Sequence, residues 1–397
     1  GGGLGWAWIL LGGSAELGEM PVDLWVPDAS LFLSALTYPH LLLGQALLFW
    51  FVLFTLRFMD QAGRVDAVWA GLTGLGAALV HPYKIPVIGV PLGIYALWRG
   101  RHSLAVTWTA LRRLLLVSLP ALTYAGYAWW FFQSDFAFTE WQRQNRLYSP
   151  SLALYVLGLG IPLALAILAI TARRPGLGHH PFPLIWFFVV PPLLYLPHPM
   201  QRRFLDGYQA PVALLAAGGL YAISPTLCQV RWRKPLLVLL LTGIVLANLF
   251  LLSGAIIAAT TPAPPVYQPA GVMSAIRWFQ KIEGNYPVVL SSYAIGNLLP
   301  AHAPVRSFVG HGAQTAHSEE KQKLVRRFFD VQADEAWRKE LLDGYGIDYV
   351  FYGPYERALG RYNPAQTPFL RLVYENSAVQ IYQHPRQTPV ESTEPGV

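Results

Sequence analysis

Apolar runs separated by short polar stretches fill residues 1–261, about two thirds of the chain. A helix that crosses a bilayer needs about 20 mostly apolar residues, because lipid offers its backbone no hydrogen-bond partners. Nine segments approach that length: 1–13, 40–57, 65–80, 85–98, 113–132, 150–171, 183–197, 208–223 and 235–258. The chain is therefore predicted to be a polytopic α-helical membrane protein with about nine spans.

The composition excludes several other classes of protein. Only 13% of the 397 residues are charged, about half the usual share. That is too few for a disordered chain, a nucleic-acid-binding tail or a typical cytosolic enzyme. The single cysteine, Cys228, excludes a disulfide framework and a multi-cysteine metal site.

The charge excess predicts an orientation. The net charge is +7, and residues 1–261 hold 16 basic and 9 acidic residues, whereas 262–397 hold 13 of each. Basic residues in short loops mark the cytoplasmic side of a membrane. Eleven of the 16 lie in one alternating set of loops. The five in the other set are Lys84, Arg143, Arg146, Arg202 and Arg203. The loops expected to face outward from the plasma membrane are therefore 14–39, 81–84, 133–149 and 198–207.

Residues 262–397 read as a different unit. A Pro-rich linker at 262–268 precedes an α/β domain at 269–384 and a polar tail at 385–397. Helices are expected at 269–283 and 318–342, and Gly344 and Gly346 are expected to end the second of them. The expected strands are 287–292, 304–309, 347–352, 369–375 and 378–383, with a hairpin turn at Asn376-Ser377. Nine spans would place this domain outside the cell.

The five outward basic residues are candidates for binding a lipid phosphate. Adjacent guanidiniums at Arg202 and Arg203, beside His198, suit a phosphate or pyrophosphate. The alternatives are contact with ordinary membrane lipid, or an ion pair between Arg203 and Asp206. Lys84 and His81 are three residues apart and suit the same ligand, or are a snorkelling lysine and a helix-terminal histidine.

The loop at 14–39 is acidic and has no basic residue of its own. It holds Glu16, Glu19, Asp23 and Asp28 and is followed by His40. Its carboxylates suit a divalent cation or a general base. Alternatively the loop is simply solvated, with Asp28 capping a short helix through 29–36.

Two further loops are open to two interpretations. The one at 133–149, with Trp141, Arg143 and Arg146, fits an interfacial amphipathic helix or the lid of a cleft. The Gly310–His317 stretch fits a ligand loop or an ordinary surface loop before a helix. The sequence shows no metal-ligand spacing and no hydrolase or ATPase motif.

Several short stretches together resemble bacterial membrane-embedded glycosyltransferases of the GT-C type, a class related to protein mannosyltransferases. They are spread over nearly the whole chain, and their order is a stronger signal than any one of them. The stretches are DLWVPD (23–28), YPH (38–40), VHPY (80–83), QRRF (201–204), GNLLPA (296–301), FVGH (308–311) and YGIDYV (345–350).

The resemblance implies transfer of a sugar from a polyprenyl-phosphate donor to a glycan, lipid or protein acceptor. In such families an acid in the first outer loop is the usual catalytic base, and a basic residue stabilises the departing phosphate. The chain begins with Gly1-Gly2-Gly3 rather than Met, so that first loop is expected to lie upstream. Asp23 and Asp28 are then second-line catalytic candidates.

For the donor phosphate, the candidates are Arg202, Arg203 and Lys84, because a phosphate needs cations and these basic residues lie on the unexpected side. Around them, His81, His198, His40, Arg143 and Arg146 are candidates for substrate binding. A divalent cation is possible and no other cofactor is implied. Two alternative functions stay open: a lipid or polysaccharide flippase or transporter, and a non-catalytic assembly scaffold. A transporter predicts ionisable residues in mid-span, and the spans from 113 onward contain none.

Overall fold

The computed structural model describes the chain apart from residues 1, 173–179, 229–232, 283–285 and 386–397. The chain forms two compact units, residues 1–133 with 146–257, and residues 134–145 with 258–397. The predicted polar tail at 385–397 lies almost wholly outside the described residues, as do Arg173, Arg174 and Arg231 among the basic residues used to predict orientation.

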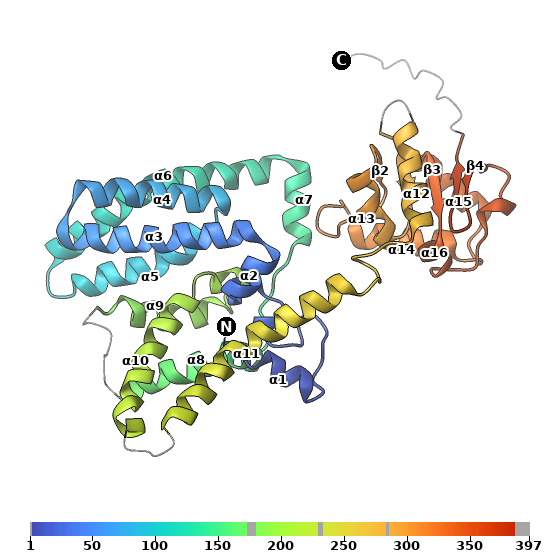
Figure 1. The fold of residues 1–397 in the computed structure, drawn as a ribbon. Helices are drawn as coiled ribbons and strands as arrows, with labels where there is room; N and C mark the ends of the chain where they lie inside the picture. Colours follow the sequence, from blue (N-terminus) through green and yellow to red (C-terminus); the bar gives the residue numbers. More distant parts are fainter. Residues whose placement is uncertain (1, 173–179, 229–232, 283–285, 386–397) are drawn as a thin grey trace, which may run out of the picture. The chain divides into compact units, whose positions relative to one another are not determined.

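The first unit is helical. Its longer helices are α3 (Pro39–Gln61), α4 (Arg64–Val80), α5 (Lys84–Arg99), α6 (Leu104–Ser134), α8 (Leu152–Thr171), α9 (Phe182–Leu193), α10 (Gln209–Cys228) and α11 (Arg233–Thr260). Helix α3 packs along α4, α5 packs against α9, and α10 packs against α8 and α9 (Figure 1). Buried apolar side chains such as Leu48, Phe51, Ile88 and Trp186 form one continuous core.

The shorter elements of this unit lie before α3 and before α10. They are α1 (Gly5–Leu10), the 3₁₀ turns η1 (Val22–Leu24) and η2 (Pro27–Ala29), helix α2 (Leu31–Thr37), and the 3₁₀ turn η3 (Gln201–Leu205). Val22 and Val26 are fully buried in the same core as Leu205. The C-terminal half of the loop predicted at 14–39 is therefore packed into the helical unit.

The prediction of nine spans is not supported. In the described residues, four helices are long and apolar enough to cross a membrane: Pro39–Gln61, Leu104–Ser134, Leu152–Thr171 and Leu237–Thr260. The predicted span at 1–13 holds a helix of only 6 residues, and those at 65–80 and 85–98 are helices of 17 and 16 residues. The helix in 183–197 ends at Leu193, after two adjacent prolines. These helices lie at or below the lower end of the length that a bilayer-spanning helix needs.

Opposite ends of α3 carry the two sets of basic residues. Near its C-terminus, Arg57 pairs with Asp66, Asp60 pairs with Arg99, and Arg113 donates to the carbonyl of Met59. Lys84 lies at the N-terminal end, against Gly44. The helix has 23 residues and is about 35 Å long, so these members of the two sets lie far apart. The side of a membrane that each end faces stays a prediction.

The second unit is a five-stranded mixed sheet between helices. Its strands are β1 (Val288–Leu290), β2 (Arg306–Ser307), β3 (Tyr349–Tyr352), β4 (Arg371–Glu375) and β5 (Gln380–Gln383), in the order β2-β1-β3-β5-β4. The first three strands in that order are parallel, and β5 is antiparallel to both its neighbours. The helices of this unit are α7 (Phe136–Gln144), α12 (Ala270–Trp278), α13 (Tyr293–His302), α14 (Ser318–Phe329), α15 (Glu335–Gly344) and α16 (Pro354–Arg357).

Alternate side chains of the sheet pack into two different hydrophobic cores. Val289 and Phe351 face a cluster that includes Ile276 of α12 and Leu299 of α13. Leu290 and Val350 face the other cluster, with Phe328 of α14 and Leu342 of α15. This period of two is what a sheet covered on both faces requires.

The sequence-based prediction of this unit needs two corrections. The helix expected at 318–342 is two helices, because Asp334 caps α15 by accepting the N–H of Trp337. Helix α13 was missed; Ser292 caps it by accepting the N–H of Ile295. The hairpin turn is confirmed, since the carboxamide oxygen of Asn376 accepts the N–H groups of Ala378 and Val379. The glycine stop is confirmed too: α15 ends at Gly344, and Gly346 has a φ of 60°.

Candidate functional site

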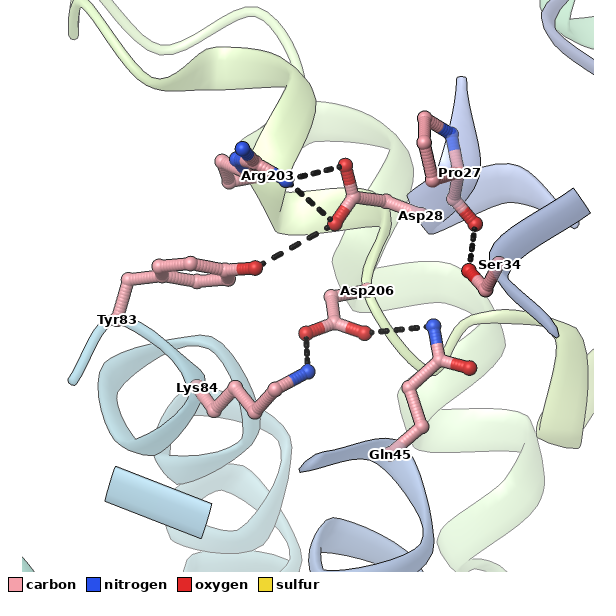
Figure 2. A network of polar contacts seen from close by, with 8 residues as sticks. All are labelled: Pro27, Asp28, Ser34, Gln45, Tyr83, Lys84, Arg203 and Asp206. Atoms are coloured by element: carbon pink, nitrogen blue, oxygen red, sulfur yellow. Dashed lines mark hydrogen bonds and ion pairs between the residues drawn. The ribbon is translucent and has the colours of Figure 1, made fainter. Parts of the chain in front are cut away.

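Six polar side chains meet at the end of the first unit where α3 begins, α4 ends and α5 begins (Figure 2). We call this set the polar network. It consists of Asp28, Gln45, Tyr83, Lys84, Arg203 and Asp206. The residues come from η2, α3, the turn before α5, α5 itself, η3 and the residue after η3. Their convergence brings together three of the predicted outward segments.

One half of the network is the pair of Asp28 and Arg203. The Nη1 atom of Arg203 donates to both carboxylate oxygens of Asp28, at 3.1 and 3.0 Å. Asp28 is 2% exposed. Burial is the largest single influence and acts to lower the pKa of Arg203, but Asp28, Tyr83 and Asp206 together outweigh it and raise the pKa above its ordinary value. Arg203 therefore stays charged, and its partner lies 175 residues away in the acidic loop.

Local sequence leaves the Asp28 side chain available for this pair. The predicted alternative, in which Asp28 caps a helix, is wrong. Ser30 caps α2 by accepting the N–H of Leu33, and Pro27 opens the 3₁₀ turn that contains Asp28. The carboxylate of Asp28 is consequently turned toward Arg203.

The other half of the network is the ion pair of Lys84 and Asp206. Both side chains are fully buried, and the second carboxylate oxygen of Asp206 accepts a hydrogen bond from Gln45 at 3.0 Å. Burial raises the pKa of Asp206, and the ammonium group of Lys84 opposes that rise. The pairing of Arg203 with Asp206, one of the alternatives from sequence, is therefore wrong.

A glycine makes the Lys84 pair possible. A Cβ at Gly44 would lie 2.6 Å from Cε of Lys84, closer than any real van der Waals contact. Any other residue at 44 would displace the lysine. Because the side chain of Lys84 is fully buried, a structural role that holds the site together is favoured. Its predicted contact with a substrate stays a prediction.

Tyr83 joins the two halves. Its hydroxyl donates to Asp28 at 3.5 Å, and its ring centroid lies 5.4 Å from the guanidinium of Arg203 and 5.7 Å from the ammonium of Lys84. Burial raises the pKa of Tyr83 further above its ordinary value, so the phenol stays protonated and able to donate.

Arg202 is placed differently from its neighbour. Its guanidinium lies 4.4 Å from the ring centroid of Trp25, whose indole N–H donates to the carbonyl of Met20. Its Nε atom is buried without a hydrogen-bond partner, and no acid within the described residues forms an ion pair with it. Burial lowers the pKa of Arg202 below its ordinary value, but the guanidinium stays a cation. Arg202 thus forms no direct ion pair within the described residues, although the nearby carboxylate of Asp28 opposes the lowering of its pKa.

His81 lies beside the network and is neutral. Burial, with the charges of Lys84 and Arg203, lowers the pKa of His81 to about 4. Its Nδ1 atom is buried and has no partner among the described residues. Its ring lies 5.4 Å from that of His40 and 5.2 Å from that of Tyr83. The structure therefore brings His81 and His40 together at the edge of the polar network.

The other candidate residues lie apart from the network. Asp23 is 3% exposed and accepts the N–H of Gly5 at 3.3 Å, and burial raises its pKa to about 7. His198 is exposed and accepts the N–H of Met200. Arg146 donates to the Tyr148 hydroxyl. Arg143 belongs to the second unit, where it pairs with Glu140 at 3.0 Å.

The charges at this end favour an anionic ligand. Three cations, Lys84, Arg202 and Arg203, face two carboxylates, those of Asp28 and Asp206. Buried polar atoms without a partner also gather here, among them the Nε atoms of both arginines. No group of three histidine, cysteine or acidic side chains in the described residues is arranged to hold a metal ion. A bound phosphate would supply the missing negative charge and the missing acceptors.

Sequence reasoning missed Gln45, Tyr83, Asp206 and Trp25 as parts of the site. Trp25, Tyr83 and Asp206 each lie within or next to a stretch that carried the family resemblance. That proximity was the available signal. Gln45 lies neither within nor next to any of these stretches. Its only signal in the sequence is an amide side chain within an apolar helix.

No family model matches the sequence, and a search of curated proteins finds no significant match to it. Solved structures do resemble it. The arabinofuranosyltransferase AftD from Mycobacteria matches 90% of this chain with a TM-score of 0.57 at 14% identity. The oligosaccharyltransferase of Archaeoglobus fulgidus, tethered with an acceptor peptide, matches 87% with a TM-score of 0.49 at 11% identity. The AglB protein of the same organism, in complex with an inhibitory peptide and a dolichol-phosphate, matches 89% with a TM-score of 0.48.

The similarity to AftD is one of fold. Its name describes a glycosyltransferase, the class of enzyme that the sequence resemblance implied. The chain spans 30% of AftD and about half of the oligosaccharyltransferases, 56% and 57% of the two chains.

Proposed function

We propose that the protein is a membrane glycosyltransferase that moves a sugar from a polyprenyl-phosphate donor to an acceptor. The observation that carries this proposal is Arg202, a cation without an acidic partner that lies over Trp25 beside the polar network. The fold similarity to an arabinofuranosyltransferase supports the reaction class. A phosphate at the end of a set of apolar helices is where a lipid-linked donor presents its head group.

Each basic residue has its own role in this proposal. Arg202 binds the donor phosphate through charge-assisted hydrogen bonds and stabilises the negative charge that grows as the sugar leaves. Arg203 and Lys84 hold η3 in place through Asp28 and Asp206. His81 is neutral and suits a hydroxyl of the sugar better than an anion.

Of the two acids considered as catalytic base, Asp23 fits the chemistry better. A general base works best when its pKa lies near the working pH, and burial raises the pKa of Asp23 to about 7. Asp28 is engaged by Arg203.

The remaining details extend the same proposal. The donor is a polyprenyl-phosphate sugar, and the acceptor is a glycan, a lipid or a protein. The reaction takes place at the outer face of a bacterial plasma membrane, and the C-terminal α/β unit is extracytoplasmic.

A transfer assay tests the proposal. Membranes that contain the protein are given polyprenyl-phosphate sugars labelled in the sugar, and release of free lipid phosphate is measured. Arg202→Ala should abolish most of the transfer, with normal insertion in the membrane. The matched control is Arg101→Ala, because Arg101 also lies over a tryptophan, Trp98 at 4.2 Å, but at the other end of the bundle. Equal activity in the two variants would contradict the phosphate role.

A further inference from the structure

The backbone of Arg202 is held by a segment that precedes α8. The N–H of Arg202 donates to the carbonyl of Leu147 at 3.0 Å, and the N–H of Leu147 donates to the carbonyl of Pro199 at 2.6 Å. The two bonds pair residue 147 with the turn that begins η3. They fix the start of the turn.

Gln201 adds further support with its side chain. Its carboxamide oxygen accepts the N–H of Ser149 at 3.0 Å, and its carboxamide nitrogen donates to the carbonyl of Leu196 at 2.7 Å. One amide therefore bridges two backbone segments on either side of Arg202. An amide is needed for both bonds, because the bridge requires one acceptor and one donor.

The Arg202 side chain depends on this support. Its Nε atom makes no hydrogen bond and its guanidinium rests on the ring of Trp25, so within the described part of the chain no side-chain hydrogen bond fixes its direction. The backbone of residue 202 therefore sets where this side chain starts, and the ring of Trp25 is the surface that its guanidinium rests on. A shift of about 1 Å in that backbone is enough to misplace a group that must meet a phosphate.

We propose that Gln201 is a positioning residue that orients Arg202 toward an anionic head group. The proposal rests on the proposed function of Arg202. Gln201 itself touches no phosphate. It holds the η3 turn between Ser149 and Leu196, so that Arg202 is preorganised before the ligand arrives.

The test is a double-mutant cycle on the full chain in lipid nanodiscs. The probe is a short-chain polyprenyl phosphate, and its dissociation constant is measured for wild type, Gln201→Met, Arg202→Ala and the double variant. Methionine keeps the length of glutamine and removes both hydrogen bonds. The matched control is Gln280→Met, since Gln280 also donates to a backbone carbonyl, that of His302, in the other unit.

If Gln201 acts through Arg202, Gln201→Met weakens binding about tenfold and adds little in the Arg202→Ala background. Gln201→Glu, which keeps the acceptor but not the donor, falls between wild type and methionine. Gln280→Met leaves binding unchanged. The thermal unfolding midpoint of each variant is recorded beside the binding constant.

Two outcomes separate failure of this inference from failure of the proposed function. If Arg202→Ala weakens binding and Gln201→Met adds its full effect to it, Gln201 does not position Arg202 although the phosphate role stands. If Arg202→Ala binds the probe as wild type does, the proposed function fails first and Gln201 has nothing to position. A Gln201→Met protein with wild-type affinity also overturns the inference.

Discussion

The Nη1 atom of Arg203 donates to both carboxylate oxygens of Asp28, across 175 residues of sequence. This contact joins the acidic loop near the start of the chain to the basic turn before α10. A buried carboxylate with a guanidinium partner avoids most of the penalty of burying an isolated charge. The two loops therefore form one structural element, with Arg202 at its edge.

Replacing Asp206 with Asn should destabilise the first unit. The change leaves the buried ammonium of Lys84 without a counter-charge, and removing one partner of a buried ion pair costs about 3–5 kcal/mol. The loss is measured from thermal unfolding in detergent, followed by tryptophan fluorescence.

A second variant separates the charge effect from packing. Lys84→Met combined with Asp206→Leu removes both charges and keeps most of the volume, so its stability should recover most of the loss. If Asp206→Asn alone unfolds at the wild-type temperature, the pair does not hold these helices together.

Gly44→Ala should disturb the same ion pair without touching a charge. The added Cβ would overlap with Cε of Lys84 at 2.6 Å, and overpacking of a core costs about 1–3 kcal/mol. Gly89→Ala is the matched control, because a Cβ there meets nothing within 4 Å. Equal unfolding temperatures for the two variants would show that Lys84 has room to move.

The stability of the second unit should fall in acid through Asp343. Its carboxylate accepts the Nε2–H of His384 at 2.7 Å, and this bond lowers the pKa of Asp343 below its ordinary value of 3.8. A lowered folded-state pKa contributes stability above the unfolded value, and the contribution disappears as the pH falls through the folded value. Since Asp343 is half exposed, the effect should stay below about 1 kcal/mol.

Hydrogen exchange of β5 in the full chain checks this prediction. Protection near His384 should decrease between about pH 4 and pH 2 in the wild type, whereas Asp343→Asn should already show the reduced protection at pH 6. Lys339→Met is the control for the neighbouring exposed pair with Asp343. The same protection in wild type and Asp343→Asn at pH 6 would contradict the assignment.

Local patterns in the sequence predict much of this fold. Apolar runs mark the helices of the first unit, and the period of two at Val289-Leu290 and Tyr349–Tyr352 marks strands that serve two cores. Counting spans failed because segments shorter than a typical bilayer-spanning helix were counted as spans. The segment 65–80 forms a helix, α4, of only 17 residues, and the helix in 183–197, α9, has 12.

The candidate site, like the fold, could be predicted from the sequence only in part. Charge patterning singles out Lys84, Arg202 and Arg203 as basic residues on the unexpected side, and the structure gathers all three at one end. It does not predict their partners, because Asp28 and Asp206 are matched to cations by tertiary packing over 175 and 122 residues. Arg203 forms an ion pair with Asp28, whereas Arg202 forms none within the described residues. The sequence does not reveal this difference, because the two arginines are adjacent.

Phosphate binding by Arg202 is the central claim, and one measurement tests it most directly. The affinity of the full chain for a short-chain polyprenyl phosphate is determined in nanodiscs at two salt concentrations, for wild type, Arg202→Ala and Arg101→Ala. A charge-assisted contact is worth about 1.5–3 kcal/mol, so Arg202→Ala should weaken binding about tenfold or more and flatten its salt dependence. Arg101→Ala should bind as wild type does. Equal affinity and equal salt dependence for wild type and Arg202→Ala would contradict the claim.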